Sequence, residues 1–453
     1  MNSIYTYIYL GIIFGIFVSF GTLFRIILNR KVDLVDWFTL AFGFFNGFSF
    51  AFILWSTNNG KNDWIWSQWL LGKSSYYPAF LASSLLFVMS VWFVASIKDF
   101  KVFIKKYDNF KPRTLVKSNN SRIAVISWVM LVAAIFSYYV YASGYGGFTN
   151  LLKFAPLIRS GRFDLIEIDN PWTFLSRVGS FAFFSSFVFF GLFLHKLKHK
   201  GAKTLDFVGF LISFAVSFFI LYSWLGRIAL VSYLLVFPIG YLIFKYGFSF
   251  RFFLWLSIIV VMVVFVAIPY MNVFLKRGTP VQDIQEFYTK EMSFPYVSFI
   301  AQLKNSTYRN MKDILMIPLY ILPDSIFKDS LNLDTSSDVN TMRIKGALKG
   351  QDNVSGEIPA DILTFSFMQG GIFGLFAVGI LLGICLLFLD SFISKLPAGI
   401  SEVLYAYAII NFVVLIIPYG DPRHIVLENI YFIFGMLALY IFKCIHIEKN
   451  RSG

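Results

Sequence analysis

Residues 207–244 read FVGFLISFAVSFFILYSWLGRIALVSYLLVFPIGYLIF, and Arg227 is the only charged residue among them. An apolar run of this length is too long for one membrane span and fits two helices joined by a tight turn. Gly226, directly before the arginine, permits such a turn. Because an arginine at mid-bilayer costs about 2.5–3.5 kcal/mol on insertion scales, the turn is expected to place Arg227 at the membrane surface.

The rest of the chain has the same character. Its 453 residues are 57% hydrophobic and only 14% charged, with a mean hydropathy of +0.69. A soluble protein carries about a quarter charged residues. The sequence therefore predicts an all-α polytopic membrane protein, with one integral membrane domain over residues 1–453. Apolar runs of about 20 residues predict eleven spans, near 4–24, 36–55, 77–97, 123–142, 173–194, 205–225, 228–244, 252–272, 364–388, 402–419 and 425–443.

The orientation follows from the basic residues, which concentrate in alternate short connections and in the C-terminal tail. Short loops rich in Lys and Arg favour the cytoplasmic side. We therefore expect the N-terminus outside, the C-terminus in the cytoplasm, and one large extracytoplasmic loop over residues 272–363. This placement also explains the net charge of +14 without nucleic acid, which is not an expected partner.

Two features refine this layout. The loop contains MIPLYILPDSIF at 316–327, which is too short to span. It is expected either to lie in the membrane interface or re-enter the bilayer, or to pack as a buried helix on the bundle. In QGGIFGLFAVGILLG at 369–383, the pairs Gly370/Gly374 and Gly379/Gly383 predict close helix packing.

Arginines on the predicted outer side are candidates for binding phosphate or pyrophosphate, because the planar guanidinium binds their oxygens bidentately. Two alternatives stay open. Arg227 can be a membrane anchor, and the arginines of the 143–172 loop can pair with nearby carboxylates. Arg177, after Asn170-Pro171, is expected about two turns inside a span whose N-cap is Asn170. The outer candidates are Arg159, Arg162, Arg227, Arg277, Arg309, Arg343 and Arg423, and His424 is a further substrate-binding candidate.

Candidate proton acceptors lie beside two spans. Glu357 and Asp361 occur in SGEIPADILTF at 355–365, and Asp421 and His424 in YGDPRH at 419–424. A carboxylate at the lipid boundary can have a raised pKa and act as a general base. Glu357 can equally be a helix N-terminal charge, and His424 can simply cap a turn.

Signatures of metal and nucleotide chemistry are missing from the sequence. It has no Asp-x-Asp, no GxxxxGK[ST] and no GxGxxG, and it has only two cysteines. Neither a metal site nor a bound cofactor is therefore expected.

Three stretches carry a resemblance to a known family. They are GYGGFTNLLKFAPLIRSGRF at 144–163, SWLGRIALVSYLL at 223–235, and GEIPADILTFSFMQGGIFGLFAVGILLG at 356–383. In this order and spacing the chain resembles the O-antigen polymerases (Wzy type), or oligosaccharide repeat-unit polymerases, over about residues 140–390.

The resemblance implies a GT-C-like glycosyltransferase in the cytoplasmic (inner) membrane of a bacterium. Its substrates would be polyprenyl-pyrophosphate-linked oligosaccharide repeat units, joined into O-antigen of lipopolysaccharide, capsule or exopolysaccharide. Since the pyrophosphate is already an activated leaving group, neither nucleotide nor metal is required. A chain-length regulator and a flippase are implied partners.

Residue by residue, Arg227 matches the family arginine that opens a central helix, and Arg159 matches the arginine of the preceding outer loop. The related O-antigen ligases carry a histidine just before the span that begins near 364, where this chain has Glu357 and Asp361 instead. The identity of the base therefore stays open between these two. A ligase-type glycan transferase and a flippase of lipid-linked sugars are the alternative functions.

Overall fold

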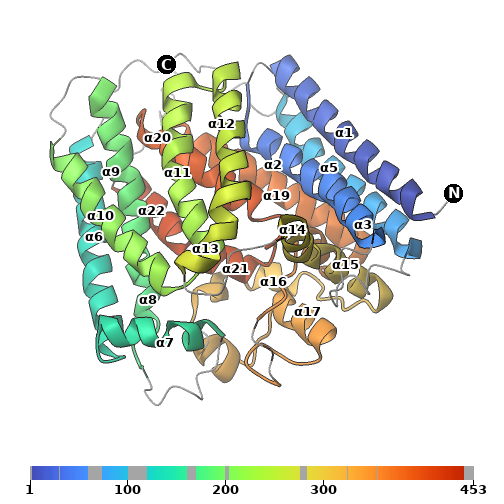
Figure 1. Ribbon diagram of the computed structural model, residues 1–453. Helices are drawn as coiled ribbons and strands as arrows, with labels where there is room; N and C mark the ends of the chain where they lie inside the picture. The colour runs from blue at the N-terminus through green and yellow to red at the C-terminus, as the bar shows by residue number, and fades with distance from the viewer. Residues whose placement is uncertain are drawn as a thin grey trace, which may run out of the picture. The chain divides into compact units, whose positions relative to one another are not determined.

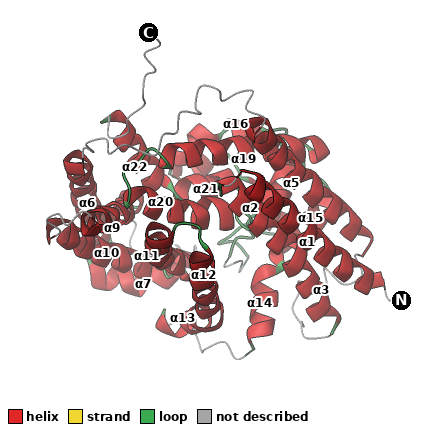
Figure 2. Ribbon diagram, turned by 90° about the horizontal axis from the view of Figure 1, so that it is seen from above, coloured by secondary structure: helices red, strands yellow, loops and turns green. Residues whose placement is uncertain are grey.

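The computed structural model describes residues 3–29, 31–59, 74–99, 120–160, 170–198, 204–275, 283–323, 325–352, 354 and 356–442. Within these ranges every regular element is a helix, as Figures 1 and 2 show. Nine of the described helices are long and apolar enough to cross a membrane, and α21 with α22 adds a tenth if that broken pair is one span. The chain is a multi-pass membrane protein.

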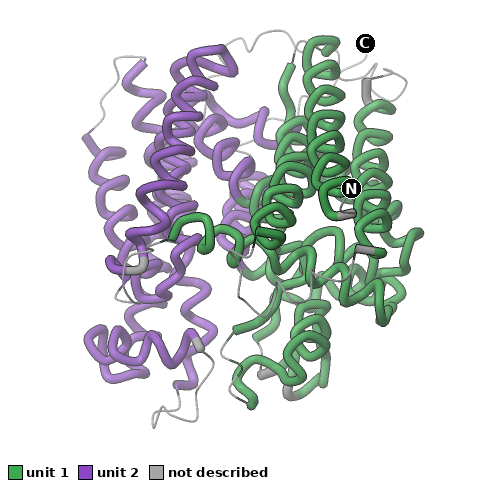
Figure 3. The backbone as a smooth tube through the Cα atoms, turned by 45° about the vertical axis from the view of Figure 1, so that its right-hand side comes forward, with its two compact units in different colours: residues 1–109, 281–389, 411–427 green, residues 110–280, 390–410, 428–453 purple. Residues whose placement is uncertain are grey.

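The helices group into two compact units, green and purple in Figure 3. Each unit is built from three separate parts of the chain. Unit 1 comprises residues 1–109, 281–389 and 411–427, and unit 2 comprises residues 110–280, 390–410 and 428–453.

Unit 1 contains three spanning segments from the N-terminal part, short helices of the long loop, and most of one late span. Its elements are α1 (Ser3–Asn29), α2 (Leu34–Gly43), η1 (Phe44–Ser49), α3 (Phe50–Asn58), η2 (Ser74–Tyr76), α5 (Tyr77–Asp99), α14 (Ile284–Met292), α15 (Phe294–Lys304), α16 (Lys312–Leu315), η5 (Ile317–Ile321), η6 (Ser325–Ser330), α17 (Ser336–Lys345), α18 (Ile362–Met368), α19 (Gly371–Ile393) and α21 (Pro422–Glu428). α19 and α21 each extend slightly into unit 2, and η7 (Ile409–Val414) crosses the same boundary.

Unit 2 is a bundle of long apolar helices with short helices at their ends. Its elements are α6 (Asn120–Ser143), α7 (Phe148–Ser160), α8 (Leu175–Gly179), α9 (Phe181–Lys198), α10 (Thr204–Ser223), α11 (Arg227–Tyr246), α12 (Phe250–Met262), η4 (Val263–Ala267), α13 (Ile268–Phe274), α20 (Ile400–Ala408) and α22 (Ile430–Ile441).

Three of the eleven expected spans differ from the sequence prediction. The span expected at 364–388 begins at Gly371, because Gly370 and Gly371 adopt positive φ and separate it from the buried α18. The helix of the span expected at 402–419 covers only Ile400–Val414 and is too short to count as a span. The last expected span, 425–443, is interrupted at Asn429.

The glycine prediction for α19 is confirmed at its second pair. A Cβ on Gly379 would lie 3.0 Å from the Phe87 carbonyl oxygen, and one on Gly383 would lie 3.3 Å from that of Val91. These glycines let α19 approach the backbone of α5 closely.

Candidate functional site

The turn that contains Arg227 joins two spanning helices of unit 2. α10 ends at Ser223 and α11 begins at Arg227, with Gly226 as an extended N-cap. Leu225 is in the left-handed region at φ 52°, which is unfavourable for a branched side chain. The predicted tight turn is confirmed, and it places the partly exposed Arg227 at a helix end rather than at mid-span.

Arg159 reaches this turn from the end of α7. Its Nη1 donates to the carbonyl oxygens of Leu225, at 2.7 Å, and Trp224, at 3.3 Å. These carbonyls directly precede Gly226, where a Cβ would lie 3.8 Å from the same nitrogen. A side chain from the 144–163 stretch therefore holds the turn in the 223–235 stretch.

A third arginine, Arg177, also lies beside this turn. Its guanidinium is 6.0 Å from the centroid of the Trp224 ring, and its Nη1 pairs with Glu428 at 3.2 Å. Both side chains of this pair are more than a third exposed. Arg177 is the third residue of the spanning segment Leu175–Lys198 and lies in its first turn, so its expected place about two turns inside a span is wrong.

The loop before α8 also differs from expectation. Asn170 does not cap a helix, because residues 171–174 form turns and α8 begins at Leu175. Its amide instead donates to the carbonyl of Tyr141 at 2.9 Å and accepts from the Trp172 N–H at 2.9 Å. A Cβ on Gly144 would collide with this amide, so a glycine is needed where α6 ends.

The three arginines around residues 224–227, which we call the arginine turn, are Arg159, Arg177 and Arg227. They come from three separate stretches of sequence and are at least partly exposed. Guanidinium groups concentrated at the end of spanning helices suit an anionic ligand that approaches along the membrane surface.

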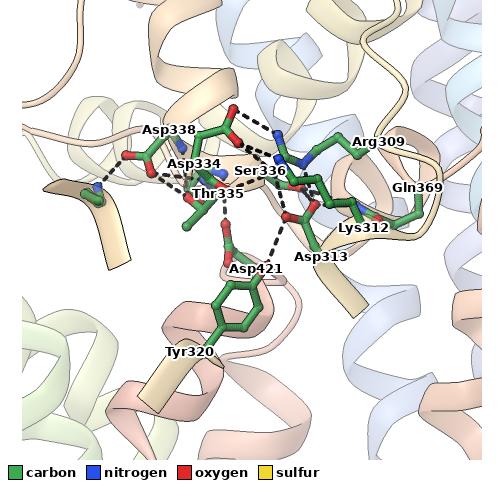
Figure 4. Close-up of polar contacts among 12 residues, drawn as sticks. Arg309, Lys312, Asp313, Tyr320, Asp334, Thr335, Ser336, Asp338, Gln369 and Asp421 are labelled. Atoms are coloured by element: carbon green, nitrogen blue, oxygen red, sulfur yellow. Dashed lines mark hydrogen bonds and ion pairs between the residues drawn. The ribbon is translucent and has the colours of Figure 1, made fainter. Parts of the chain in front are cut away.

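In unit 1, Arg309 has a different environment, shown in Figure 4. Its Nε and Nη2 donate to Asp313 at 2.6 and 2.9 Å, and its Nη1 and Nη2 donate to the Asp334 carboxylate at 3.2 and 3.1 Å. These carboxylates and their hydrogen bonds raise the pKa of Arg309 further. All three of its nitrogens already bind carboxylates, which argues against the predicted role in binding phosphate.

Asp313 is the centre of this cluster and is fully buried. Besides Arg309, it accepts hydrogen bonds from Tyr320 at 3.0 Å, Ser336 at 2.6 Å and Gln369 at 2.7 Å. A buried carboxylate with this many donors is satisfied. The Asp313 cluster thus ties α16, η5, α17 and the end of α18 together.

The other basic candidates of unit 1 are spread out. Arg343 donates to Thr307 Oγ1 at 2.5 Å. Arg423 is buried, donates to the carbonyl of Leu322 at 3.1 Å and lies over the Phe327 ring at 3.9 Å. His424 is exposed and stacks on Tyr419 with ring centroids 5.0 Å apart.

Asp421, a candidate proton acceptor beside His424, is buried. Its carboxylate accepts hydrogen bonds from backbone N–H groups. It accepts from the N–H groups of Ser337 at 2.8 Å and Arg423 at 2.9 Å. Burial raises its pKa above the usual range. This carboxylate organises the chain around residue 337, while the His424 ring faces solvent.

The two carboxylates proposed as the base differ in availability. Asp361 is the N-cap of α18 and accepts from the N–H groups of Leu363 and Thr364 at 3.0 and 3.1 Å and from the Thr364 hydroxyl. Burial raises its pKa to about 7. Glu357 lies outside any helix. The alternative role of a negative charge at a helix N-terminus therefore fits Asp361 and not Glu357.

The Glu357 side chain reaches solvent but is flanked by protein. Reduced hydration, together with the negative charges of Asp338 and Asp421, raises its pKa to about 7. Of the two carboxylates, Glu357 is the one a substrate could reach.

The sequence predicted most of these candidate residues, but it did not predict the side chains that form hydrogen bonds with them. Arg162 and Arg277 lie outside the described residues. Asp313, Tyr320 and Gln369 were not predicted, although the Arg309/Asp313 spacing of four residues within RNMKD was a usable signal. Among the residues that the structure describes, no group of three His, Cys, Asp or Glu side chains is arranged to hold a metal.

Comparison with known proteins adds no relative, since no family model, curated protein or solved structure matches the chain.

Proposed function

We propose that the protein is a glycosyltransferase that polymerises polyprenyl-pyrophosphate-linked oligosaccharide repeat units at the outer face of the cytoplasmic membrane. The observation that supports this best is the contact between Arg159 and the carbonyls of Trp224 and Leu225. It links two of the three stretches that carry the family resemblance and gathers arginines at the end of spanning helices.

The proposed reaction is a single nucleophilic displacement at the anomeric carbon. The bond between the anomeric carbon of the growing chain and its pyrophosphate breaks, and a glycosidic bond to the acceptor hydroxyl forms. Negative charge grows on the departing pyrophosphate, and fixed guanidinium groups stabilise it. In this proposal Arg227 contacts the pyrophosphate, while Arg159 mainly positions the turn.

The acceptor hydroxyl must lose its proton as it attacks. Of the two candidate carboxylates of unit 1, Glu357 is better suited to act as a base than Asp361, because its oxygens are not used as a helix cap and its pKa lies near neutral pH. Asp361 is less suited, since its carboxylate already accepts three hydrogen bonds from Leu363 and Thr364.

The test is reconstitution of the purified protein in liposomes with synthetic polyprenyl-pyrophosphate repeat units and a chelator. A ladder of lengthening products on the lipid, with release of polyprenyl pyrophosphate, is expected. Transfer only to a different acceptor would indicate a ligase, and movement of intact substrate across the bilayer without chain growth would indicate a flippase. Either result, or no reaction with a verified cognate substrate, contradicts the proposal.

A further inference from the structure

The long loop carries an uncharged stretch whose surroundings are unusual. Residues 314–323, ILMIPLYILP, connect α16 with η6 and contain no charged side chain. The sequence left two readings open for this region, an interfacial segment or a buried helix on the bundle. The structure gives two short helices, α16 and η5, separated at Met316.

This stretch exposes apolar side chains and has polar side chains behind it, which is the reverse of a surface that faces water. Its apolar side chains point outward: Leu315 is 78% exposed, Ile321 46% and Leu319 38%. By contrast, Asp313 and Tyr320 are fully buried and bonded to each other at 3.0 Å. Contiguous exposed apolar groups with a polar interior behind them mark a surface that is covered in the functioning protein.

The inward side of the stretch is firmly held. Tyr320 packs edge-on against the buried Phe327 at 5.5 Å, and Phe327 lies under Arg423. Because Tyr320 is also tied to Asp313, η5 cannot rotate to bury its aliphatic side chains without breaking the Asp313 cluster. The outward apolar face is therefore fixed by the fold.

The chain just before this stretch is hydrogen-bonded to the residues that precede the N-terminus of α19. The N–H of Arg309 donates to the carbonyl of Met368 at 2.7 Å, and that of Met311 donates to the carbonyl of Gln369 at 3.1 Å. A Cβ on Gly371, the first residue of α19, would lie 3.4 Å from the Tyr308 ring. The loop thus starts at the level where a spanning helix begins.

The exposed surface at the start of α19 is also apolar. The first turn of α19 exposes Ile372 by 72% and Phe373 by 67%, as expected for a spanning helix at the edge of a bundle. Tyr308 is also exposed, and tyrosine is favoured at the membrane–water interface. The exposed apolar face of α16 and η5 thus follows directly on a chain segment that is hydrogen-bonded to the start of an exposed apolar helix.

We propose that the apolar face of residues 315–321 inserts into the bilayer at the boundary between headgroups and acyl chains, in the leaflet where α19 begins. The occupant of this face is lipid. The stretch is too short to span, but it has the apolar outer face of an interfacial element. This inference rests on the membrane character of the chain and not on the proposed function.

The test measures how deeply the face is immersed. Cys385 and Cys444 are replaced by serine, and nitroxide spin labels are attached to Leu315→Cys and Leu319→Cys in nanodiscs. Lys349→Cys, an exposed position of the same loop, is the matched control. Because both leucine side chains are exposed, the substitutions should leave the fold intact, which monodisperse elution checks.

We expect labels at 315 and 319 to be accessible to dissolved oxygen and shielded from a water-soluble nickel complex, with the reverse at 349. Nickel accessibility at 315 equal to that at 349 would overturn the proposal. Shielding from both agents would also overturn it, since it would indicate a protein partner, and dipolar broadening between labels would indicate a second copy of the chain. None of these results bears on glycan transfer.

Discussion

Arg309 in unit 1 and Arg159 in unit 2 are the same residue type in opposite situations. Arg309 is buried and its three nitrogens bind two carboxylates, whereas Arg159 is exposed and donates to two backbone carbonyls at a turn. Carboxylates neutralise a guanidinium, but carbonyl oxygens leave its net charge in place. Arg309 is therefore committed to the folded structure of the loop, whereas the described contacts of Arg159 fix the position of the turn.

The contrast shows how arginines in a membrane protein can be sorted by their partners. Sequence placed both residues on the same side of the membrane, with the same proposed role. The distinction comes from Asp313 and Asp334, which reach Arg309 only in the folded loop. The carboxylate partners of Arg309, and not its location along the chain, mark it as a structural arginine.

The largest effect is expected from the removal of the Arg309 side chain. Arg309→Ala leaves the charge of the buried Asp313 without its main partner, and removing one member of a buried ion pair costs about 3–5 kcal/mol. We expect a large drop in unfolding temperature in detergent, measured by intrinsic fluorescence. Arg122→Ala, at an exposed position, is the control and should unfold like the parent. A loss for Arg309→Ala as small as that of the control would show that the cluster is not structural.

The second prediction applies the same comparison to the carboxylates Glu357 and Asp361. If Glu357 is the base, chain growth should rise with pH through about 7, since the carboxyl must lose its proton to accept another. Glu357→Gln should lower the rate by about 10²–10⁴-fold and flatten this profile. Asp361→Asn retains an N-cap acceptor and should keep the pH profile. A Glu357→Gln protein with the parent's profile would exclude Glu357 as the base.

The same raised pKa values have a consequence for stability. Both carboxyls bind protons more tightly in the folded state than at their ordinary values near 4. Their neutral forms are therefore favourable to folding at low pH, and this contribution is lost as the pH rises through about 7. The Glu357 part of it is reduced by solvent, because that side chain is exposed.

The smallest expected effect concerns Arg159 as a positioning residue. Arg159→Gln keeps a neutral donor near the turn but removes the charge, and charge-assisted hydrogen bonds contribute about 1.5–3 kcal/mol. We expect chain growth to slow by roughly 10–100-fold at saturating substrate, with a smaller fall in unfolding temperature than for Arg309→Ala. Arg159→Lys should recover part of the rate, since a lysine can still donate to one carbonyl. A fall in substrate affinity alone would instead make Arg159 a direct pyrophosphate ligand.

The sequence was sufficient for features that depend on local pattern. The turn at Gly226–Arg227 followed from an apolar run too long for one helix, and the close packing of Gly379 and Gly383 followed from their spacing. The break at Gly370–Gly371 was hidden because the residues on both sides are apolar. The Asp313 cluster was out of reach for another reason: its donors come from positions 309, 320, 336 and 369, which only the tertiary fold brings together.

The most direct measurement of the central claim compares Arg227→Ala with Arg122→Ala in the reconstituted polymerisation assay. Both arginines are in unit 2, and neither is fully buried. We expect Arg227→Ala to insert and unfold like the parent but to lose polymer formation, Arg227→Lys to restore little of it, and Arg122→Ala to form the full ladder. Full activity in Arg227→Ala would contradict the account and make Arg227 a membrane anchor.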